Sequence, residues 1–188
     1  EVLSYQFSCV IVERVAGGAE TRWQGLLKPK GPKVEDRMSL EEFVSAAVQQ
    51  GLAEHPEMSV PTAVYLVAHF TRADLPGFIN FKDEQMRSKM NLQNIRNNFM
   101  NISEDIAVEV PLLGEGDPLL LKVQIRDTKT LSPTESKKLA DIGDILGLEK
   151  IVLADTPEGE LLVISNMKDL MVKNWDLFYR YAMRDAEI

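Results

Sequence analysis

An aspartate follows an uninterrupted apolar stretch of this sequence after one short loop. The run "TAVYLVAHF" ends at His69 and Phe70, and Asp74 comes shortly after them in "TRAD". In open α/β sheets, ligands collect beyond the carboxyl ends of strands, because the strand fixes position while the following turn carries reactive groups. Asp74 is therefore a candidate for the chemistry of this chain. The alternative is that its carboxylate caps a helix that begins at Leu75.

A second candidate pair lies near the other end of the sequence, in "YRYAMRDAEI". Tyr181 and Asp185 are four residues apart, so on a helix their side chains share one face and lie about one turn apart. A phenol and a carboxylate in this arrangement can address one water molecule. Such a pair taken alone is more often an ordinary surface contact, so its meaning depends on the elements around it.

The elements that must position these residues follow the order of an α/β protein. Residues 39–51 predict a helix, because Ser39 and Glu42 form a capping box and Gly51 follows the apolar positions. Residues 62–70 predict a central strand covered on both faces. The remaining expected elements are a hairpin of residues 2–12 and 20–28, a helical region over 74–99, a strand pair at 106–112 and 119–128, a helix that ends at Gly147, strands at 150–155 and 160–165, and a helical region from 166 onward.

Composition bounds the class of protein. A chain of 188 residues with 45% hydrophobic content can bury one core, so residues 1–188 predict a single domain. Cys9 has no partner for a disulfide, and one cysteine with two histidines makes no structural zinc site, which favours a reducing, cytoplasmic setting. The sequence contains neither a long apolar span nor a secretory signal, so we expect no membrane association.

The charge of the chain bears on its partners. A net charge of -8 argues against binding nucleic acid by bulk electrostatics. Basic residues nevertheless gather within 22–37 and within 82–96. We interpret these two clusters as solvated loops, with a binding groove as the alternative.

Three segments together resemble the tyrosine-bearing DEDD 3′–5′ exonucleases of RNase H-like fold. "LVAHFTRADL" looks like the second exonuclease motif, although Phe70 stands where asparagine is common and Ala73 where phenylalanine is common. "LKVQIRDTKTLSPTESKKLADIGDILGLEKI" is similar to the segment between the second and third motifs. "YAMRDAEI" looks like the third motif. The segments occur in the family's order and cover most of the chain, and they are most similar to the proofreading domains of family B, protein-primed DNA polymerases.

The resemblance implies a fold and a site. The fold is an α/β, RNase H-like mixed sheet flanked by helices. Asp74 and Asp185 are implied to be two of four carboxylates that hold two Mg²⁺ or Mn²⁺ ions, with Tyr181 orienting the attacking water. His69 and Phe70 are implied to border the pocket, where an aromatic side chain can stack on a terminal base. A strand-end histidine and a core phenylalanine are the alternative for these two.

The family's first motif, Asp-x-Glu on the opening strand, is absent from the expected place. Two acid-x-acid runs elsewhere do not replace it, because Asp185-Ala-Glu187 is expected on the last helix and Glu158-Gly-Glu160 in a turn. "VLSYQFSCVIV" matches the family's second strand, so we expect that the first strand is missing from this sequence, or that the site has been lost. Asp127 and Thr128 are interpreted as structural residues that cap the following turn.

Three hypotheses follow. The first is a two-metal 3′–5′ exonuclease that trims single-stranded DNA ends, with proofreading beside a polymerase domain or subunit as one setting. The second is a catalytically inactive RNase H-like module that binds nucleic acid or a protein partner. The third is a structural interaction protein in which the Tyr-Asp pair is accidental.

Overall fold

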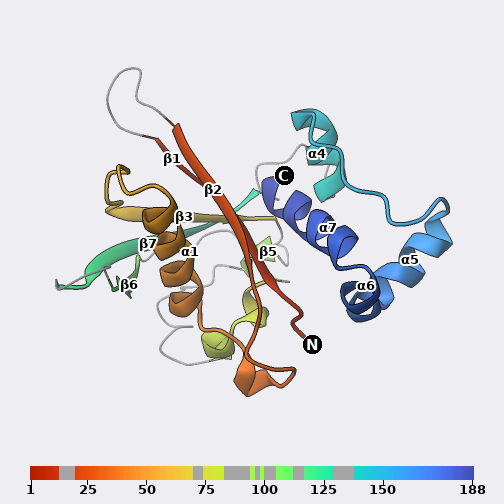
Figure 1. Ribbon diagram of the computed structural model, residues 1–188, viewed down its shortest axis with the longest axis horizontal. Coiled ribbons are helices and arrows are strands. Elements are labelled where there is room, and N and C mark those ends of the chain that lie inside the picture. Colours follow the sequence, from red (N-terminus) through yellow and green to blue (C-terminus); the bar gives the residue numbers. More distant parts are fainter. Residues whose placement is uncertain are drawn as a thin grey trace.

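Two larger β-sheets organise the protein (Figure 1). The computed structural model describes residues 1–12, 20–69, 74–82, 94–95, 98–99, 105–111, 117–128 and 138–188. The first sheet is an antiparallel hairpin of β1 (Tyr5–Val12) and β2 (Glu20–Leu27). The second is a mixed sheet in the order β3 (Ala63–Ala68), β7 (Leu119–Asp127), β6 (Ile106–Val110). These pairings confirm both predicted antiparallel pairs.

Strands β6 and β7 form because their apolar residues alternate with polar or exposed ones. Successive side chains of a strand point to opposite faces, so residues two apart line one face. On β6 this places Ile106, Val108 and Val110 in the core, and Val108 lies opposite Leu121 of β7. Val123 continues the same buried face. This face of the mixed sheet forms one side of the core.

Helix α1 (Leu40–Glu54) joins the two sheets. Its apolar side includes Phe43, Val44 and Val48, and these side chains belong to one buried cluster with residues of both sheets. The β1–β2 hairpin runs between α1 on one side and α7 (Trp175–Glu187) on the other (Figure 1). The core is therefore shared, although no described strand of the hairpin pairs with a described strand of the mixed sheet.

The start of α1 is as predicted, and its end is not. Ser39 Oγ accepts a hydrogen bond from the backbone N–H of Glu42 at 3.0 Å, and Glu42 Oε2 accepts one from the N–H of Ser39 at 2.8 Å. The helix continues past Gly51, which we expected to stop it. A side chain at Gly51 would collide with the indole of Trp23. This glycine therefore permits a close helix–strand contact and does not end the helix.

Strand β3 departs from the expectation that it is central and covered on both faces. It lies at the edge of the described sheet and pairs in parallel only with β7. Its exposure alternates along the strand, and Tyr65 and Val67 are 62% and 56% exposed. The prediction of two covered faces was wrong, because aromatic and β-branched residues have high strand propensity even where one face of the strand is exposed.

The segment after β7 also differs from the prediction. Residues 157–165, expected to be a turn and a strand, form helix α5 (Pro157–Ser165), and 150–155 has no regular structure. Thr156 Oγ1 accepts from the N–H of Gly159 at 3.2 Å, and Pro157 occupies the first helical position. This capping residue and proline are standard helix-start signals that outweighed the β-branched residues.

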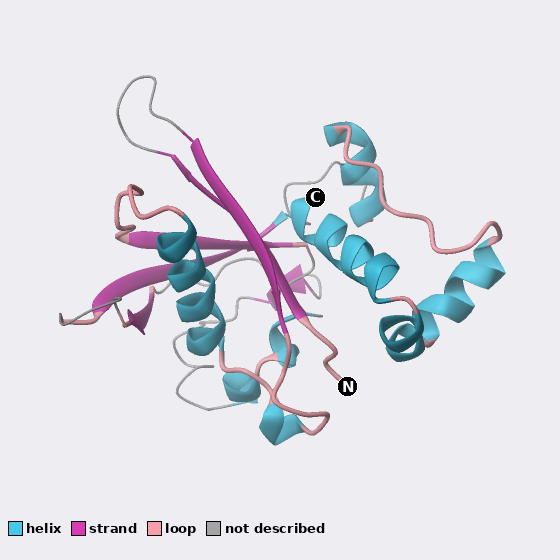
Figure 2. Cartoon of the chain, in the orientation of Figure 1, coloured by secondary structure: helices cyan, strands magenta, loops and turns pink. Residues whose placement is uncertain are grey.

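The other C-terminal elements are helical, as Figure 2 shows. Helix α4 (Leu139–Leu146) ends as predicted at Gly147, which has a φ of 71°. Helix α6 (Met167–Lys173) leads to α7 through Asn174, whose side chain caps α7. Helices α5 and α6 bury none of their side chains. None of the helices among the described residues is long and apolar enough to cross a membrane.

Shorter elements fill the remaining described ranges. Short 3₁₀ turns are formed by η1 (Val34–Asp36), η2 (Leu75–Gly77) and η3 (Ile79–Lys82). Within the region expected to be helical over 74–99, β4 (Asn94–Ile95) pairs with β5 (Asn98–Phe99), so the helix prediction is wrong there. A mixed sheet flanked by helices confirms the α/β class and is consistent with an RNase H-like fold.

Candidate active site

Tyr181 and Asp185 lie on helix α7, on the side that packs towards β1. The helix is amphipathic, and Phe178, Tyr181 and Met183 are buried. Tyr181 and Asp185 line the same cavity of about 280 Å³, together with the segment that leads into β1. The prediction that the phenol and the carboxylate share one helix face is confirmed. A chain segment from the N-terminal end of the sequence reaches the same cavity.

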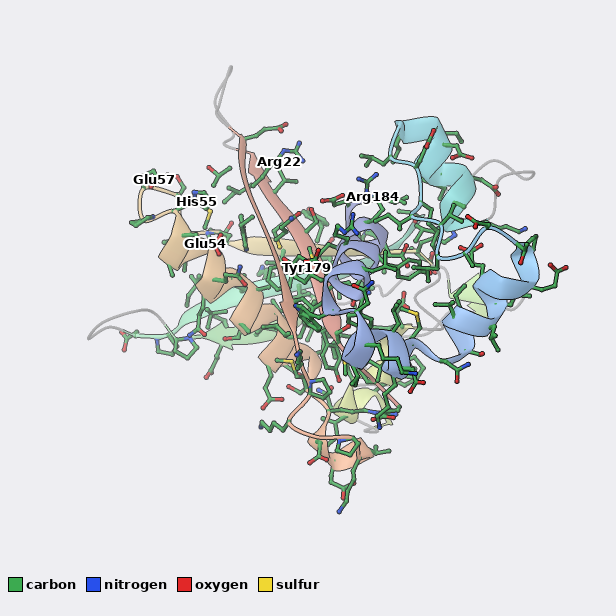
Figure 3. The ribbon with its side chains drawn as sticks, turned by 45° about the vertical axis from the view of Figure 1, so that its right-hand side comes forward. Arg22, Glu54, His55, Glu57, Tyr179 and Arg184 are labelled. Carbon is green, nitrogen blue, oxygen red and sulfur yellow. The ribbon has the colours of Figure 1, made fainter. Side chains whose placement is uncertain are left out.

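Lys150 completes a small cluster with these two residues. Its Nζ lies 3.4 Å from Asp185 Oδ1 and 5.2 Å from the centre of the Tyr181 ring. The side chains of Lys150 and Asp185 are 28% and 21% exposed, so both charges are largely removed from water. Figure 3 shows α7 with Arg184, the neighbour of Asp185 in sequence, and Tyr179 labelled. Sequence reasoning missed Lys150, because only the folded chain brings its loop to α7.

The charges of this cluster depend on each other. Burial raises the pKa of Asp185 above its ordinary value, and the ammonium group of Lys150 opposes that rise. Burial by itself would lower the pKa of Lys150, but Asp185 and Tyr181 together raise it. Asp185 Oδ1 is buried and has no hydrogen-bond partner among the described residues. Its main electrostatic support is therefore the ion pair with Lys150.

Asp74 lies with a different group of side chains, at the carboxyl ends of β3 and β7. Burial of the carboxyl group and the nearby charge of Asp127 raise the pKa of Asp74 to about 6, and His69 opposes this rise. The residue as a whole is exposed, so water screens part of these electrostatic interactions. Asp127 is 9% exposed and is the buried acid of this group.

The alternative role for Asp74, a helix cap, is not what the structure has. The element that follows is the short turn η2, the backbone of Asp74 is itself in the helical region, and its side chain makes no capping hydrogen bond. At the neighbouring strand end, His69 Nδ1 lies 3.1 Å from Thr128 Oγ1. Phe70, the other residue expected to border the pocket, lies outside the described residues.

The described residues form two clusters and not one complete metal site. The charges that act on Asp74 come from Asp127 and His69, whereas Asp185 interacts with Lys150. Within the described ranges, no three His, Cys, Asp or Glu side chains are grouped so that they could hold a metal ion. These residues alone therefore do not fit a pair of divalent cations. The proposed roles of Asp74, Asp185, Tyr181 and His69 remain predictions.

The first basic cluster makes contacts typical of a solvated loop. Lys28 Nζ lies 4.0 Å from the ring centre of Trp175, and Lys30 pairs with Glu42 at 3.5 Å. Arg37 donates to the carbonyl of Pro76 at 3.0 Å. These contacts favour the loop interpretation over a binding groove. Most of the second basic cluster lies outside the described residues.

Comparison with known proteins finds a distant relative among DNA polymerases. The chain is 25% identical over 202 residues to the primer-independent DNA polymerase PolB of Escherichia coli. The match covers 100% of this chain but 22% of PolB, so the chain spans about a fifth of the length of this relative. No protein-family model matches the chain, and no solved structure matches it. The chain is thus distantly similar, over its whole length, to part of a DNA polymerase.

Proposed function

We propose that this chain is a 3′–5′ exonuclease segment of a protein related to DNA polymerases, and that it removes nucleotides from single-stranded DNA ends. The whole-length similarity to PolB supports a polymerase relationship. The observation that carries the nuclease part is the shared cavity of Tyr181 and Asp185, with Lys150 beside both side chains. A phenol and a carboxylate that line one cavity, with an ammonium group beside both, suit a reaction on an anionic phosphodiester.

In this proposal each residue has a separate task. Tyr181 orients a water molecule, and Asp185 and Asp74 contribute carboxylate oxygens, the ligands that Mg²⁺ and Mn²⁺ prefer. These two carboxylates alone do not hold a pair of ions; with further ligands, two such ions would supply an activated water and stabilise the leaving oxygen. His69 borders the DNA end. Lys150 favours the ionised form of Asp185, because its positive charge opposes the rise in pKa that burial causes.

The two carboxylates need further ligands, and the arrangement of the sheets suggests where these belong. Among the described strands, β1 pairs only with β2 and β3 pairs only with β7, so each has one edge without a described partner. Both strands nevertheless contribute to one core. We propose that a strand carrying the family's Asp-x-Glu motif pairs with these edges. It would add carboxylates between the cluster of Asp74 and the cluster of Asp185.

The experiment uses the full-length protein and a single-stranded oligonucleotide labelled at its 5′ end. Gel electrophoresis follows shortening from the 3′ end with Mg²⁺ or Mn²⁺. Asp74→Asn and Asp185→Asn are expected to abolish shortening and leave the thermal unfolding curve cooperative. Asp144→Asn, on the exposed side of α4, is the matched control and should keep the parent rate. If both site variants also keep that rate, the nuclease proposal is wrong.

A second candidate is a catalytically inactive module that binds single-stranded DNA or a polymerase partner. The ion pair of Asp185 with Lys150, and the separation of the described acids into two clusters, favour this candidate. It predicts DNA binding in a fluorescence anisotropy assay without shortening in any divalent metal. It also predicts that calorimetry with Mn²⁺ gives the same result for the parent protein and for Asp185→Asn, because Asp185 binds no metal in such a module.

A further inference from the structure

A cation that belongs to the chain itself lies beside Asp185, where the resemblance to exonucleases implies a metal ion. Lys150 Nζ is 3.4 Å from Asp185 Oδ1, and both side chains are largely buried. A second cation at this oxygen would lie close to the ammonium group, and two positive charges repel each other more strongly in a partly buried site than in water. The described cluster therefore disagrees with a metal ion at Asp185 while Lys150 stays in place.

The loop that carries Lys150 is attached to two helices. Arg184, labelled on α7 in Figure 3, donates from Nη1 to the backbone carbonyl of Glu149 at 3.1 Å. The N–H of Leu148 donates to the carbonyl of Gly143 on α4 at 2.7 Å. These two hydrogen bonds hold the residues just before Lys150. The fold, and not the freedom of a long surface side chain, therefore places its ammonium group.

The ion pair is longer than a hydrogen bond between the same groups. A charge-assisted hydrogen bond from nitrogen to a carboxylate oxygen spans about 2.7–2.9 Å, whereas Lys150 Nζ and Asp185 Oδ1 are 3.4 Å apart. Oδ1 is buried and accepts no hydrogen bond from the residues that the structure describes. Nζ also lies 5.2 Å from the centre of the Tyr181 ring, within the range of a cation–π attraction. The ring thus offers the ammonium group a second position when it leaves Oδ1.

We propose that Lys150 is a resident counter-ion of Asp185, and that it keeps a divalent cation from this carboxylate until the ammonium group moves towards Tyr181. The proposal rests on the proposed function for the role of Asp185 as a metal ligand. It gives Lys150 two opposite effects, because the same charge stabilises the ionised carboxylate and competes for its oxygen. A neutral residue at position 150 should therefore strengthen metal binding at Asp185 while it weakens the fold.

The first test is a calorimetric titration of the full-length protein with Mn²⁺ alone, without DNA. Lys150→Met should bind Mn²⁺ roughly tenfold more tightly than the parent protein, because a repelling charge beside the carboxylate has been removed. Lys150→Arg retains the charge and should keep the weaker affinity of the parent. Adding Asp185→Asn to Lys150→Met should abolish the gain.

Thermal unfolding gives a second measurement of the same gain. A ligand that binds only the folded state stabilises it by an amount that grows with its affinity. Addition of Mn²⁺ should therefore raise the Tm of Lys150→Met by more than it raises the Tm of the parent protein. The comparison is made within each protein, with and without Mn²⁺, so a lower starting stability of the variant does not affect it.

Lys173→Met is the matched control, because Lys173 forms an exposed pair with Asp169 at 2.9 Å on α6. It should leave the affinity for Mn²⁺ unchanged. If Lys150→Met does not fold, Lys150→Gln gives the same comparison with a neutral polar side chain. Equal affinities of the parent and the neutral variant overturn the proposal. A gain that persists after Asp185→Asn also overturns it, because the metal then binds elsewhere.

The oligonucleotide assay separates this proposal from the nuclease proposal. If Lys150→Met binds Mn²⁺ more tightly but neither it nor the parent shortens the oligonucleotide, the counter-ion role is supported and the nuclease proposal is wrong. If shortening depends on Asp185 but the affinity for Mn²⁺ does not change with Lys150, the counter-ion role is wrong and the nuclease proposal is supported.

Discussion

Removing the charge of Lys150 tests the electrostatics of the α7 cluster most directly. Lys150→Met keeps most of the aliphatic stem and removes the ammonium group that lies 3.4 Å from Asp185 Oδ1. The carboxylate of Asp185 then stays buried without the charge that opposes its rise in pKa. We expect the pKa of Asp185 to rise further, and the protein to lose stability where Asp185 is ionised.

The size of the effect follows from the distance and the exposure of the pair. Two unit charges at 3.4 Å attract by about 5 kcal/mol at an effective dielectric constant of about 20, and by about 1 kcal/mol in bulk water. Since both side chains are only partly buried, we take about 1–3 kcal/mol for this attraction, and its loss raises the pKa of Asp185 further. Burying Lys150 itself costs free energy that methionine avoids, so the net loss of unfolding free energy is about 1–2 kcal/mol.

The loss should depend on pH in a defined direction. The folded-state pKa of Asp185 is raised, so its protonated form is favoured in the folded protein. The associated stability is present at low pH and is lost as pH rises through the folded-state pKa. In Lys150→Met this loss is larger. The gap between parent and variant should therefore be smaller near about pH 4 than at neutral pH, because the protonated form of Asp185 becomes more populated as the pH falls.

Urea unfolding at the two pH values measures this gap, and ¹³C NMR of the carboxyl groups measures the pKa of Asp185. Lys173→Met is the control, because Lys173 forms an exposed pair with Asp169 at 2.9 Å that should contribute little. Equal stability of Lys150→Met and its parent at both pH values would refute the electrostatic reasoning. An unshifted pKa of Asp185 would refute it independently.

Three further perturbations probe the fold and the site. Gly51→Ala should lower the unfolding free energy by about 1–2 kcal/mol, because overpacking against Trp23 outweighs the better helix propensity of alanine. Urea unfolding measures this loss. When Trp23 is replaced by the smaller phenylalanine, the same Gly51→Ala change should become neutral or stabilising. Asp74→Asn should remove the decline in stability as pH rises through about 6, since asparagine does not ionise, and urea unfolding on either side of that pH checks it. Tyr181→Phe should slow the oligonucleotide shortening of the full-length protein and leave its Tm within a few degrees, and an unchanged rate would exclude Tyr181 from the reaction.

Local signals account for the elements that could be predicted from the sequence. The capping box at Ser39 and Glu42 fixes the start of α1 through two short hydrogen bonds, so these residues alone are sufficient to predict where the helix begins. Strands β6 and β7 are likewise predicted from local sequence, because apolar residues at every second position give each strand one buried face. The helix start at Thr156-Pro157 was also visible, but the β-branched residues after it suggested a strand.

Tertiary contacts decide the features that the sequence does not reveal. The need for Gly51 comes from Trp23 on another element, and the exposure of Tyr65 depends on what covers the sheet. Lys150 has no recognisable spacing to Asp185, because a folded loop brings them together. The clustering of Asp74 with Asp127 likewise follows from the parallel pairing of β3 with β7, which the local pattern of neither strand encodes.

The packing of α1 against residues of both sheets has a consequence for how the chain reaches its native state. The partners of this helix come from β1 and β2 before it and from β6 and β7 much later in the sequence. During synthesis the helix can pack on the hairpin early, but the apolar side chains that contact β6 and β7 remain exposed to solvent until β7 has left the ribosome. Contacts between such distant segments slow folding. A polypeptide that ends between α1 and β7 should therefore expose this apolar surface, and should bind chaperones or aggregate.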